Sequence, residues 1–490
     1  MMSQQAIRPF WKNFIGGRWV EGARGRRIAL EDPATAEPLA EIARAEVEDA
    51  DRAVQAARHA FDADVLRAIK PERRAAMLFR IADALEALAE QIGQAECLDN
   101  GKRISDARAQ AGESARYFRY YGGIADKLEG RSIPLGEAYV DYTMHEPYGV
   151  SAQVVPWNYP LQLAVRSVSC ALAAGNTVVV KSPVLCPLSV CLLGEACQRA
   201  EVPDGAVNIL CGSGAEVGTA LVAHPGVDHV VFTGSVPTGR AILRLAAERV
   251  IPSVMELGGK SAGVVYPDAD LDAVADDVIT GAFSNAGQLC SILARLIVHR
   301  RIFKDLSARL VERIAKLSVG PGIEDHDVTP LISAAQRDKV EAFCRRAEAA
   351  GADRVVGGRP APDLPGHFFL PSVYADVSPE MEIAKEEIFG PVLCLLRFET
   401  PEEAVALANG TDYGLVAGVY TRDLNLAHWT ARQLVAGQVF VNQWFAGGVE
   451  TPFGGTRRSG FGREKGQEAM LNYVQTKNVA IRLTDRQIRR

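Results

Sequence analysis

The chain has 490 residues, of which 48% are hydrophobic and 23% are charged, and its formal net charge is −6. This length predicts two or three domains, because one hydrophobic core rarely extends beyond about 250–300 residues. The small net charge, with no long block of like charges, excludes the electrostatic signature of a nucleic-acid or anionic-membrane binder, and the average composition excludes a disordered or fibrous chain.

The stretch 1–17 lacks the continuous apolar core of a signal peptide, and the most apolar stretch, 161–180, is interrupted by Arg166 and Asn176. We therefore expect a cytoplasmic protein without a membrane segment. The weakly basic tail 484–490 is expected to be solvated.

Nine cysteines are scattered along the chain, without CxxC pairs or the Cys/His spacing of a zinc site. Neither a disulfide framework nor a metal centre is predicted. Most of the cysteines, including Cys170, Cys191 and Cys197 in apolar helical patterns, are expected to pack as small hydrophobic residues. The open question is Cys290, which follows a Gly-Gln pair in FSNAGQLCSI and could be a packed thiol or a nucleophile.

Two amphipathic helices are predicted first, at 46–62 and 71–100, from apolar residues with i, i+3 and i+4 spacing. From residue 149 the pattern changes to short β-branched runs that end in Gly or Pro, separated by helical stretches at 187–200 and 215–223. The strands expected in this first series are 149–156, 176–183, 207–212, 228–234 and 261–269.

A second series follows from residue 262, with strands expected near 295–300, 391–399, 414–421 and 437–443. Alternating strands and helices predict an α/β protein with a doubly wound parallel sheet, which binds its ligand at the carboxyl ends of the strands. Two stretches of alternating β character lie outside both series, at 138–150 and 473–483, and could pair as a small projecting sheet.

One segment of the first series, FTGSVPTGR at 232–240, has the features of a phosphate-binding turn. A strand precedes it and a helical run follows, so Gly234 and Gly239 could bring backbone N–H groups to phosphate oxygens. Because it is not a GxGxxG fingerprint, an ordinary strand-to-helix turn is the alternative, and the same two interpretations apply to GSGAEVG at 212–218. Lys181 ends the strand NTVVVK, where it could meet a ribose or phosphate or be solvated.

Two further side chains could act with Cys290. Glu256, in VMELGGKSAG, lies among apolar residues and is either a satisfied buried acid or a general base with a raised pKa. Asn158, in VVPWNYPL, could donate its amide to a developing oxyanion or could form an Asx turn.

These motifs, with EEIFGPV at 386–392 and PFGGTRRSGFGRE at 452–464, occur in an order and spacing that resemble the NAD(P)-dependent aldehyde dehydrogenase superfamily. The resemblance extends from residue 14 to residue 483. It implies a Rossmann-type doubly wound cofactor domain at 1–125 and 149–257 and a second α/β, catalytic domain at 258–460. A small oligomerisation β-ribbon from 126–148 and 461–490 would make homodimers or homotetramers.

The resemblance also implies the site. Cys290 would be the nucleophile, Glu256 the base that activates it or the deacylating water, and Asn158 an oxyanion-hole donor together with the Cys290 backbone N–H. Glu464 matches an acid proposed as a second proton acceptor. The implied cofactor-binding residues are Pro156, Trp157, Lys181, Gly214, Gly218, Gly234, Ser235, Gly239, Leu257, Glu387 and Phe389.

The implied reaction oxidises an aldehyde to a carboxylic acid through a thiohemiacetal and a thioester, with NAD as the hydride acceptor. Where many NAD-preferring members carry a glutamate, this chain has Val184, so a 2′-phosphate is not repelled and NADP is an alternative cofactor. Two other classes compete, a CoA-acylating dehydrogenase, which Glu256 disfavours, and a non-catalytic scaffold.

Matching positions place the aldehyde channel along Tyr159, Leu163, Arg166, Trp444, Phe445 and Phe453, although each of these could instead pack in the core. Aromatic walls favour an aromatic or medium-chain aldehyde. Arg166 could instead bind the carboxylate of a semialdehyde such as succinic semialdehyde, or it could be a structural ion-pair partner.

Overall fold

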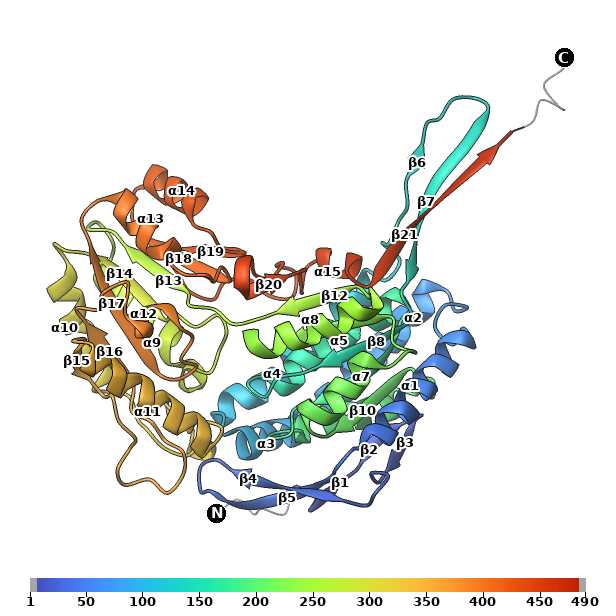
Figure 1. The fold of residues 1–490 in the computed structure, drawn as a ribbon, viewed down its shortest axis with the longest axis horizontal. Coiled ribbons are helices and arrows are strands. Elements are labelled where there is room, and N and C mark those ends of the chain that lie inside the picture. Colours follow the sequence, from blue (N-terminus) through green and yellow to red (C-terminus); the bar gives the residue numbers. More distant parts are fainter. Residues whose placement is uncertain (1–6, 484–490) are drawn as a thin grey trace.

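The computed structural model describes residues 7–483, which form two large sheets, a small N-terminal sheet and a projecting ribbon (Figure 1). The two predicted end segments reach beyond this range, and the basic tail 484–490 lies outside the described residues. The α/β architecture of alternating strands and helices is confirmed, but the strand expected at 261–269 in the first series forms β13 (Ala262–Val265) of the second large sheet.

The first large sheet has eight strands, and its five middle strands run parallel. These strands are β-branched runs that are buried almost throughout, the pattern expected when helices cover both faces of a sheet. The spatial order is β20 (Gly460–Phe461), β12 (Ser253–Glu256), β11 (His229–Thr233), β8 (Val150–Val154), β9 (Thr177–Ser182), β10 (Val207–Cys211), β2 (Asn13–Ile15) and β3 (Arg18–Val20).

Helices cover both faces of this sheet, and two separate hydrophobic clusters fill the interfaces. One face packs against α5 (Pro160–Ala174) and α6 (Leu188–Arg199). On these helices pack α2 (Pro71–Ala87), α3 (Ala89–Asn100) and α4 (Ile104–Gly123). The other face packs against α1 (Val47–Asp62), α7 (Thr219–Ala223) and α8 (Val236–Arg249).

Helix α1 confirms the prediction at 46–62, but the single helix predicted at 71–100 is wrong. The chain forms α2 and α3 there, because Leu88 leaves helical geometry at φ −98° and ψ 6°. The helix predicted at 215–223 begins as a π-helical turn over Gly214–Gly218 before α7.

The order of the strands creates a switch point in the first sheet. From β8 the chain moves to β9 and β10 on one side, and it returns to β11 and β12 on the other. Ligands of open parallel sheets bind outside the carboxyl ends of the strands at such a point.

The second large sheet has seven strands, parallel except at its β15 edge. Its order is β15 (Asp353–Val356), β16 (Ser372–Ala375), β17 (Val392–Phe398), β14 (Arg295–His299), β13 (Ala262–Val265), β18 (Val416–Tyr420) and β19 (Gln438–Val441). The helices of this half are α9 (Leu271–Phe283), α10 (Phe303–Ile314), α11 (Ala334–Ala349), α12 (Glu382–Lys385), α13 (Pro401–Asn409) and α14 (Leu424–Gln433).

Two small sheets complete the fold. Strands β1 (Phe10–Trp11), β5 (Glu37–Ala43) and β4 (Arg27–Asp32) form the N-terminal sheet. The pairing predicted between 138–150 and 473–483 is confirmed, since β7 (Tyr139–Pro147) pairs antiparallel with β21 (Val474–Arg482) over nine residues. Strand β6 (Ser132–Ile133) adds a third strand, and Figure 1 shows this ribbon projecting from the body beyond α15 (Glu468–Leu471).

Among residues 7–483, the helices do not combine the length and the apolar character needed to span a membrane.

Candidate active site

Cys290 lies in a loop whose backbone is turned sharply away from α9. Asn285, Ala286 and Gly287 have φ angles of 50°, 52° and 74°, in the left-handed region that side chains disfavour. At Gly287 a Cβ atom would lie 2.1 Å from the Gly390 carbonyl oxygen, so the close approach of these two segments requires glycine. The turn ends the helix and leads the chain into the cysteine segment.

Side chains from distant segments hold this loop on both sides of the thiol. The Ile332 backbone N–H donates to the Gln288 side chain at 2.9 Å. On the other side the Trp444 indole N–H donates to the Ser291 carbonyl at 3.1 Å. The thiol is therefore presented by a loop that is anchored immediately before and after it.

Cys290 differs from the other cysteines in exposure. Eight of the nine are buried, which confirms the prediction that most of them pack, whereas Cys290 is partly exposed and lines a cavity. Its surroundings raise the pKa of its thiol to about 12, chiefly through burial and then through the negative charge of Glu387, while Arg166 opposes the shift. A nearby base is therefore needed to deprotonate it at neutral pH.

Asn158 connects the β8–α5 loop to the cysteine loop. Its side-chain amide donates to the Gln288 carbonyl at 3.0 Å, and the Asn285 amide donates to the Asn158 carbonyl at 3.2 Å. Asn158 also lines the same cavity as Cys290. The contact across 130 residues of sequence fixes the amide beside the thiol, unlike the local Asx turn that was the alternative.

Glu256 ends β12 as a buried carboxylate with 2% of its surface exposed. Within the described part of the chain, neither carboxylate oxygen has a hydrogen-bond partner. Burial therefore raises the pKa of Glu256 to about 8, with Arg166 opposing the shift and Glu464 adding to it. The alternative of a satisfied buried acid is wrong, and the unpartnered carboxylate suits a general base.

Space around Glu256 depends on a glycine. Gly454 has φ +156°, and a Cβ atom there would lie 2.8 Å from a Glu256 carboxylate oxygen. The glycine-rich segment after Phe453 thus leaves the carboxylate free of side-chain contact on that side.

Arg166 and Glu464 form a buried ion pair. The Arg166 Nε donates to Glu464 at 2.7 Å, and the two side chains are 4% and 1% exposed. Glu464 also accepts from the hydroxyls of Ser167 at 3.3 Å and Tyr473 at 3.2 Å. Of the two roles predicted for Arg166, the structure therefore supports the ion-pair partner.

The cavity beside Cys290 has a volume of about 540 Å³. The sequence-predicted residues that line it are Asn158, Tyr159, Leu163, Arg166, Cys290, Phe445 and Phe453. Trp444 lies behind this wall, where it packs against Phe440 and is 4% exposed, so its contribution is to the cysteine loop.

Sequence analysis missed one wall of the cavity. Six residues of α4 line it, with Lys465 beyond them, and the α4 residues are Asp106, Ala109, Gln110, Glu113, Arg116 and Tyr117. Their spacing of three and four places them on one helical face. This stripe of polar side chains along one face of α4 was the only sign in the sequence that the helix borders a cavity. It does not indicate which other element the helix faces.

The residues expected to bind a cofactor lie at the carboxyl ends of the first sheet's parallel strands. Lys181 is near the end of β9, and positions 214 and 218 are open enough that a Cβ atom there would lie 3.8 and 4.0 Å from the Lys181 side chain. Ser235 caps α8 by accepting from the Thr238 N–H at 3.4 Å. At Gly239 a Cβ atom would lie 2.6 Å from Leu257, so glycine permits α8 to pack closely here. Gly234 lies between β11 and this cap.

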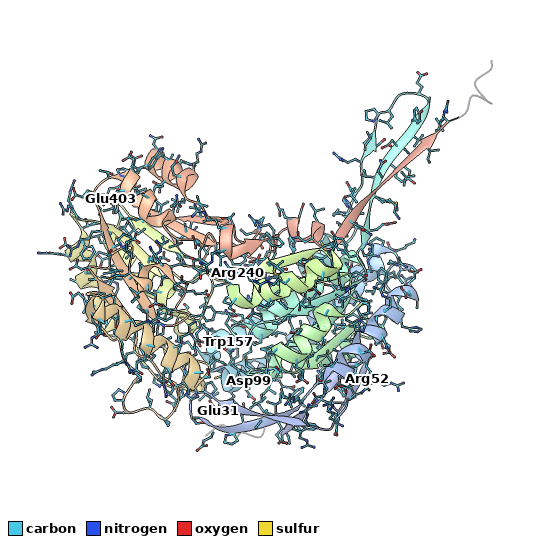
Figure 2. All side chains as sticks on the ribbon, viewed as in Figure 1. Glu31, Arg52, Asp99, Trp157, Arg240 and Glu403 are labelled. Carbon is cyan, nitrogen blue, oxygen red and sulfur yellow. The ribbon has the colours of Figure 1, made fainter. Side chains whose placement is uncertain are left out.

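A second group of these residues comes from the other half of the chain. Glu387 accepts from the Gly259 N–H at 3.1 Å, and its pKa is raised to about 7 by burial. Phe389 stands edge-on to Trp157, with 5.2 Å between the ring centres. Trp157 follows Pro156 after β8 and is labelled in Figure 2 where elements of the two large sheets meet.

This arrangement fits a dinucleotide. The 14-residue helix α8 directs its N-terminus toward the strand ends, which suits a pyrophosphate. Burial lowers the pKa of Lys181 to about 8, so a ribose or phosphate oxygen would supply a partner that this amine needs. Glu387 lies beside Gly258 and Gly259, where its carboxylate can accept hydrogen bonds from hydroxyl groups of the ligand.

Comparison with known proteins identifies relatives over nearly the full length. The model of the aldehyde dehydrogenase family matches residues 19–479. An aldehyde dehydrogenase of Aspergillus niger is 40% identical over 474 residues, which cover 96% of this chain and 95% of the relative.

Two solved structures have the same fold. Betaine aldehyde dehydrogenase from Staphylococcus aureus in complex with NAD+ is 34% identical, with a TM-score of 0.95 over 97% of this chain and 95% of that one. An indole-3-acetaldehyde dehydrogenase complexed with NAD+ is 36% identical, with a TM-score of 0.96 over 98% of each chain.

Proposed function

Since this chain belongs to the aldehyde dehydrogenase family and is an enzyme of that class, we propose that it oxidises an aldehyde with an apolar body to the carboxylic acid through Cys290. The observation that carries the proposal is the cavity that holds Cys290 and Asn158, together with the Glu256 carboxylate, which has no hydrogen-bond partner among the described residues and whose charge acts on the Cys290 thiol.

The first step requires a thiolate at Cys290. Glu256 accepts the thiol proton, because its own pKa is raised to about 8 and its oxygens are free. The sulfur then forms a bond to the aldehyde carbon, and the carbonyl π electrons move to oxygen. The Asn158 amide and the Cys290 N–H donate to this oxyanion.

A bound dinucleotide supplies the acceptor for the hydride that leaves the tetrahedral carbon. The protein's part is to hold the thiohemiacetal oxyanion and to keep Cys290 anchored while the carbon–hydrogen bond breaks. The carbonyl then re-forms as a thioester on Cys290.

Deacylation returns the enzyme to its starting state. The proton that Glu256 accepted from Cys290 first passes to solvent. Glu256 then takes a proton from a water molecule, whose oxygen bonds to the thioester carbon. The carbon–sulfur bond breaks, the carboxylic acid leaves, and the proton now on Glu256 returns to the sulfur and restores the thiol. Because Glu256 serves water here, hydrolysis is favoured over transfer to CoA.

NAD is the proposed cofactor, with the strand-end residues described above as its binding site. The NAD+ complexes of the two relatives support this choice. NADP remains the alternative, because the exposed corner beyond Lys181 carries Val184, whose side chain offers no charge to repel a 2′-phosphate.

An aromatic or medium-chain aldehyde is the proposed substrate. Tyr159, Leu163, Phe445 and Phe453 supply apolar surface along the cavity. Binding of a semialdehyde carboxylate through Arg166 is not favoured, because the ion pair that Glu464 makes with its Nε already neutralises the guanidinium.

We also infer a homodimer or homotetramer assembled through the ribbon. Tyr139, Val140, Tyr142 and Ile481 of the ribbon are exposed, each by 38% or more. Contiguous exposed apolar side chains on a projecting sheet favour a protein partner, and light scattering of the purified protein measures the assembly.

The test of the reaction follows the absorbance of reduced cofactor with NAD+ or NADP+ and a panel of benzaldehydes and C4–C8 alkanals. We expect Cys290→Ala to abolish turnover and the product to be the free acid, whether or not CoA is present. No reduction with any aldehyde, or an acyl-CoA product, would overturn the proposal.

A further inference from the structure

Lys465 is a cation that lines the Cys290 cavity and has no side-chain partner among the residues that the structure describes. The other two cations of the lining are engaged, Arg116 with Glu450 at 3.6 Å and Arg166 with Glu464 at 2.7 Å. In residues 7–483, Lys465 makes neither a side-chain hydrogen bond nor an ion pair. The cavity therefore contains one positive group that no protein carboxylate neutralises directly.

The backbone holds Lys465 in a conformation that its residue type disfavours. Its φ is +63°, in the left-handed region where glycine is the usual choice. Hydrogen bonds on both sides fix it, since Glu464 and Phe453 exchange two backbone bonds of 2.7 Å, and the Gly466 N–H donates to the Val449 carbonyl at 2.7 Å. The fold thus keeps a lysine directed into the cavity at a local conformational cost.

The surroundings of Lys465 suit a guest anion. Its ammonium stands 5.4 Å from the centre of the Phe453 ring, so an apolar surface lies next to the charge. Burial lowers the pKa of Lys465 to about 8, with Arg166 contributing, while Glu113, Cys290 and Glu450 oppose the shift. Glu113, the acidic wall residue that acts most strongly on this pKa, is itself engaged, because it accepts from the Gln162 amide at 2.8 Å.

We propose that Lys465 recognises a carboxylate carried by the aldehyde, so that the preferred substrates are oxo acids whose apolar body lies against Phe453. This inference rests on the proposed oxidation and specifies its substrate class. The sequence suggested Arg166 as the residue that binds a substrate carboxylate. Because Arg166 is paired with Glu464, we assign that role to Lys465 instead. A charge-assisted contact of this kind contributes both affinity and orientation.

The test uses pairs of aldehydes of similar shape, one charged and one neutral. Purified enzyme with NAD+ is assayed with 4-carboxybenzaldehyde against 4-methylbenzaldehyde, and with 5-oxopentanoate against pentanal. For wild type we expect kcat/KM to favour the carboxylated member of at least one pair. Lys465→Met should lower that preference about tenfold or more, the effect of losing a charge-assisted contact, and Lys465→Arg should retain most of it.

A control variant separates Lys465 from cavity charge in general. Arg116→Met removes a positive charge from the same wall, but one that Glu450 already engages, so the preference should change far less than in Lys465→Met. An equal loss in both variants would show that the cavity responds to its overall charge, which would overturn the specific role of Lys465.

Alkylation of Cys290 gives a second measurement that needs neither cofactor nor turnover. The negatively charged iodoacetate should react faster relative to neutral iodoacetamide in wild type and Lys465→Arg than in Lys465→Met. Unchanged preference and unchanged alkylation ratio in Lys465→Met would overturn the inference. Oxidation of neutral aldehydes alone would overturn it while leaving the proposed reaction standing, and failure to oxidise any aldehyde would overturn both.

Discussion

The end of β12 and the loop after β20 each carry a buried glutamate, and the two have opposite surroundings. The strands are neighbours that pair at Glu256 and Gly460. Glu464 is held by Arg166, Ser167 and Tyr473, whereas Glu256 has no partner for either oxygen in the described residues. The same side chain therefore serves structure where its charge is neutralised and is available for proton transfer where it is not.

The largest effect that this comparison predicts is on the activity of Glu256→Gln. We expect kcat to fall by about 10²–10⁴-fold, the contribution of a general base. The melting temperature should change little, because the carboxylate has no hydrogen bond to lose. Steady-state kinetics and thermal denaturation measure the two effects, with the exposed Glu402→Gln on α13 as the control. Wild-type turnover in Glu256→Gln would remove the distinction between the two carboxylates.

The reciprocal prediction concerns the stability of Glu464→Ala. Removing one partner leaves the Arg166 guanidinium buried and unpaired, which should cost about 3–5 kcal/mol of unfolding free energy. Replacing both charges in Arg166→Met/Glu464→Leu should recover much of the loss. Urea denaturation of the three proteins measures this. If Glu464→Ala unfolds at the same urea concentration as wild type, the ion pair is not structural.

Asn158→Ala tests the group that contacts the substrate oxygen, separately from the base Glu256. Loss of one oxyanion-hole donor should lower kcat/KM about 10²–10³-fold. Alkylation of Cys290 by iodoacetamide should continue in this variant, since the thiol and Glu256 are unchanged. Kinetics that match wild type would exclude Asn158 from oxyanion stabilisation, and a loss of alkylation would indicate that the cysteine loop had moved.

The smallest expected effect is a shift of the pH profile. Glu256 is active as a base when deprotonated, so kcat/KM should rise with pH up to about 8, the value to which burial raises its pKa. Glu464 adds to that shift, while Arg166, Arg463 and Lys465 oppose it. Glu464→Gln removes a negative charge and should move the rising limb to lower pH, by under about one pKa unit for a single neighbouring charge. A limb that stays in place would show that the two carboxylates do not interact.

Some of the expected cofactor-site residues are tied to a local sequence pattern, whereas others, such as Glu387 and Phe389, were expected only from the family resemblance. Ser235 and Gly239 follow a strand and open a helix, and Lys181 is part of a β-branched run, so their positions follow from where strands end. Asn158 and Cys290 were recognisable from short motifs that also specify tight turns. The roles proposed for these residues stay predictions until the variants are measured.

The residues that line the Cys290 cavity were less predictable than the cofactor-site residues, because the lining depends on which segments of the chain meet in the fold. The polar face of α4 could be recognised as a stripe, but its position opposite Cys290 depends on how α4 packs on α5. Trp444 was expected in the wall and lies behind it, where it anchors the cysteine loop. The sequence pattern around an aromatic residue is the same whether its side chain lines the cavity or packs behind the cavity wall.

By itself, the sequence determined the alternation of strands and helices and the pairing of the ribbon, since hydrophobic periodicity and turn chemistry are local properties. Local patterns left a structural alternative open for Cys290, Glu256 and Asn158, and the family resemblance singled them out. The tertiary structure decided that Arg166 is neutralised by Glu464, and that, over residues 7–483, Glu256 has no hydrogen-bond partner and Lys465 lines the cavity unpaired. Charge compensation depends on contacts between residues hundreds of positions apart, and these arise only when the chain is folded.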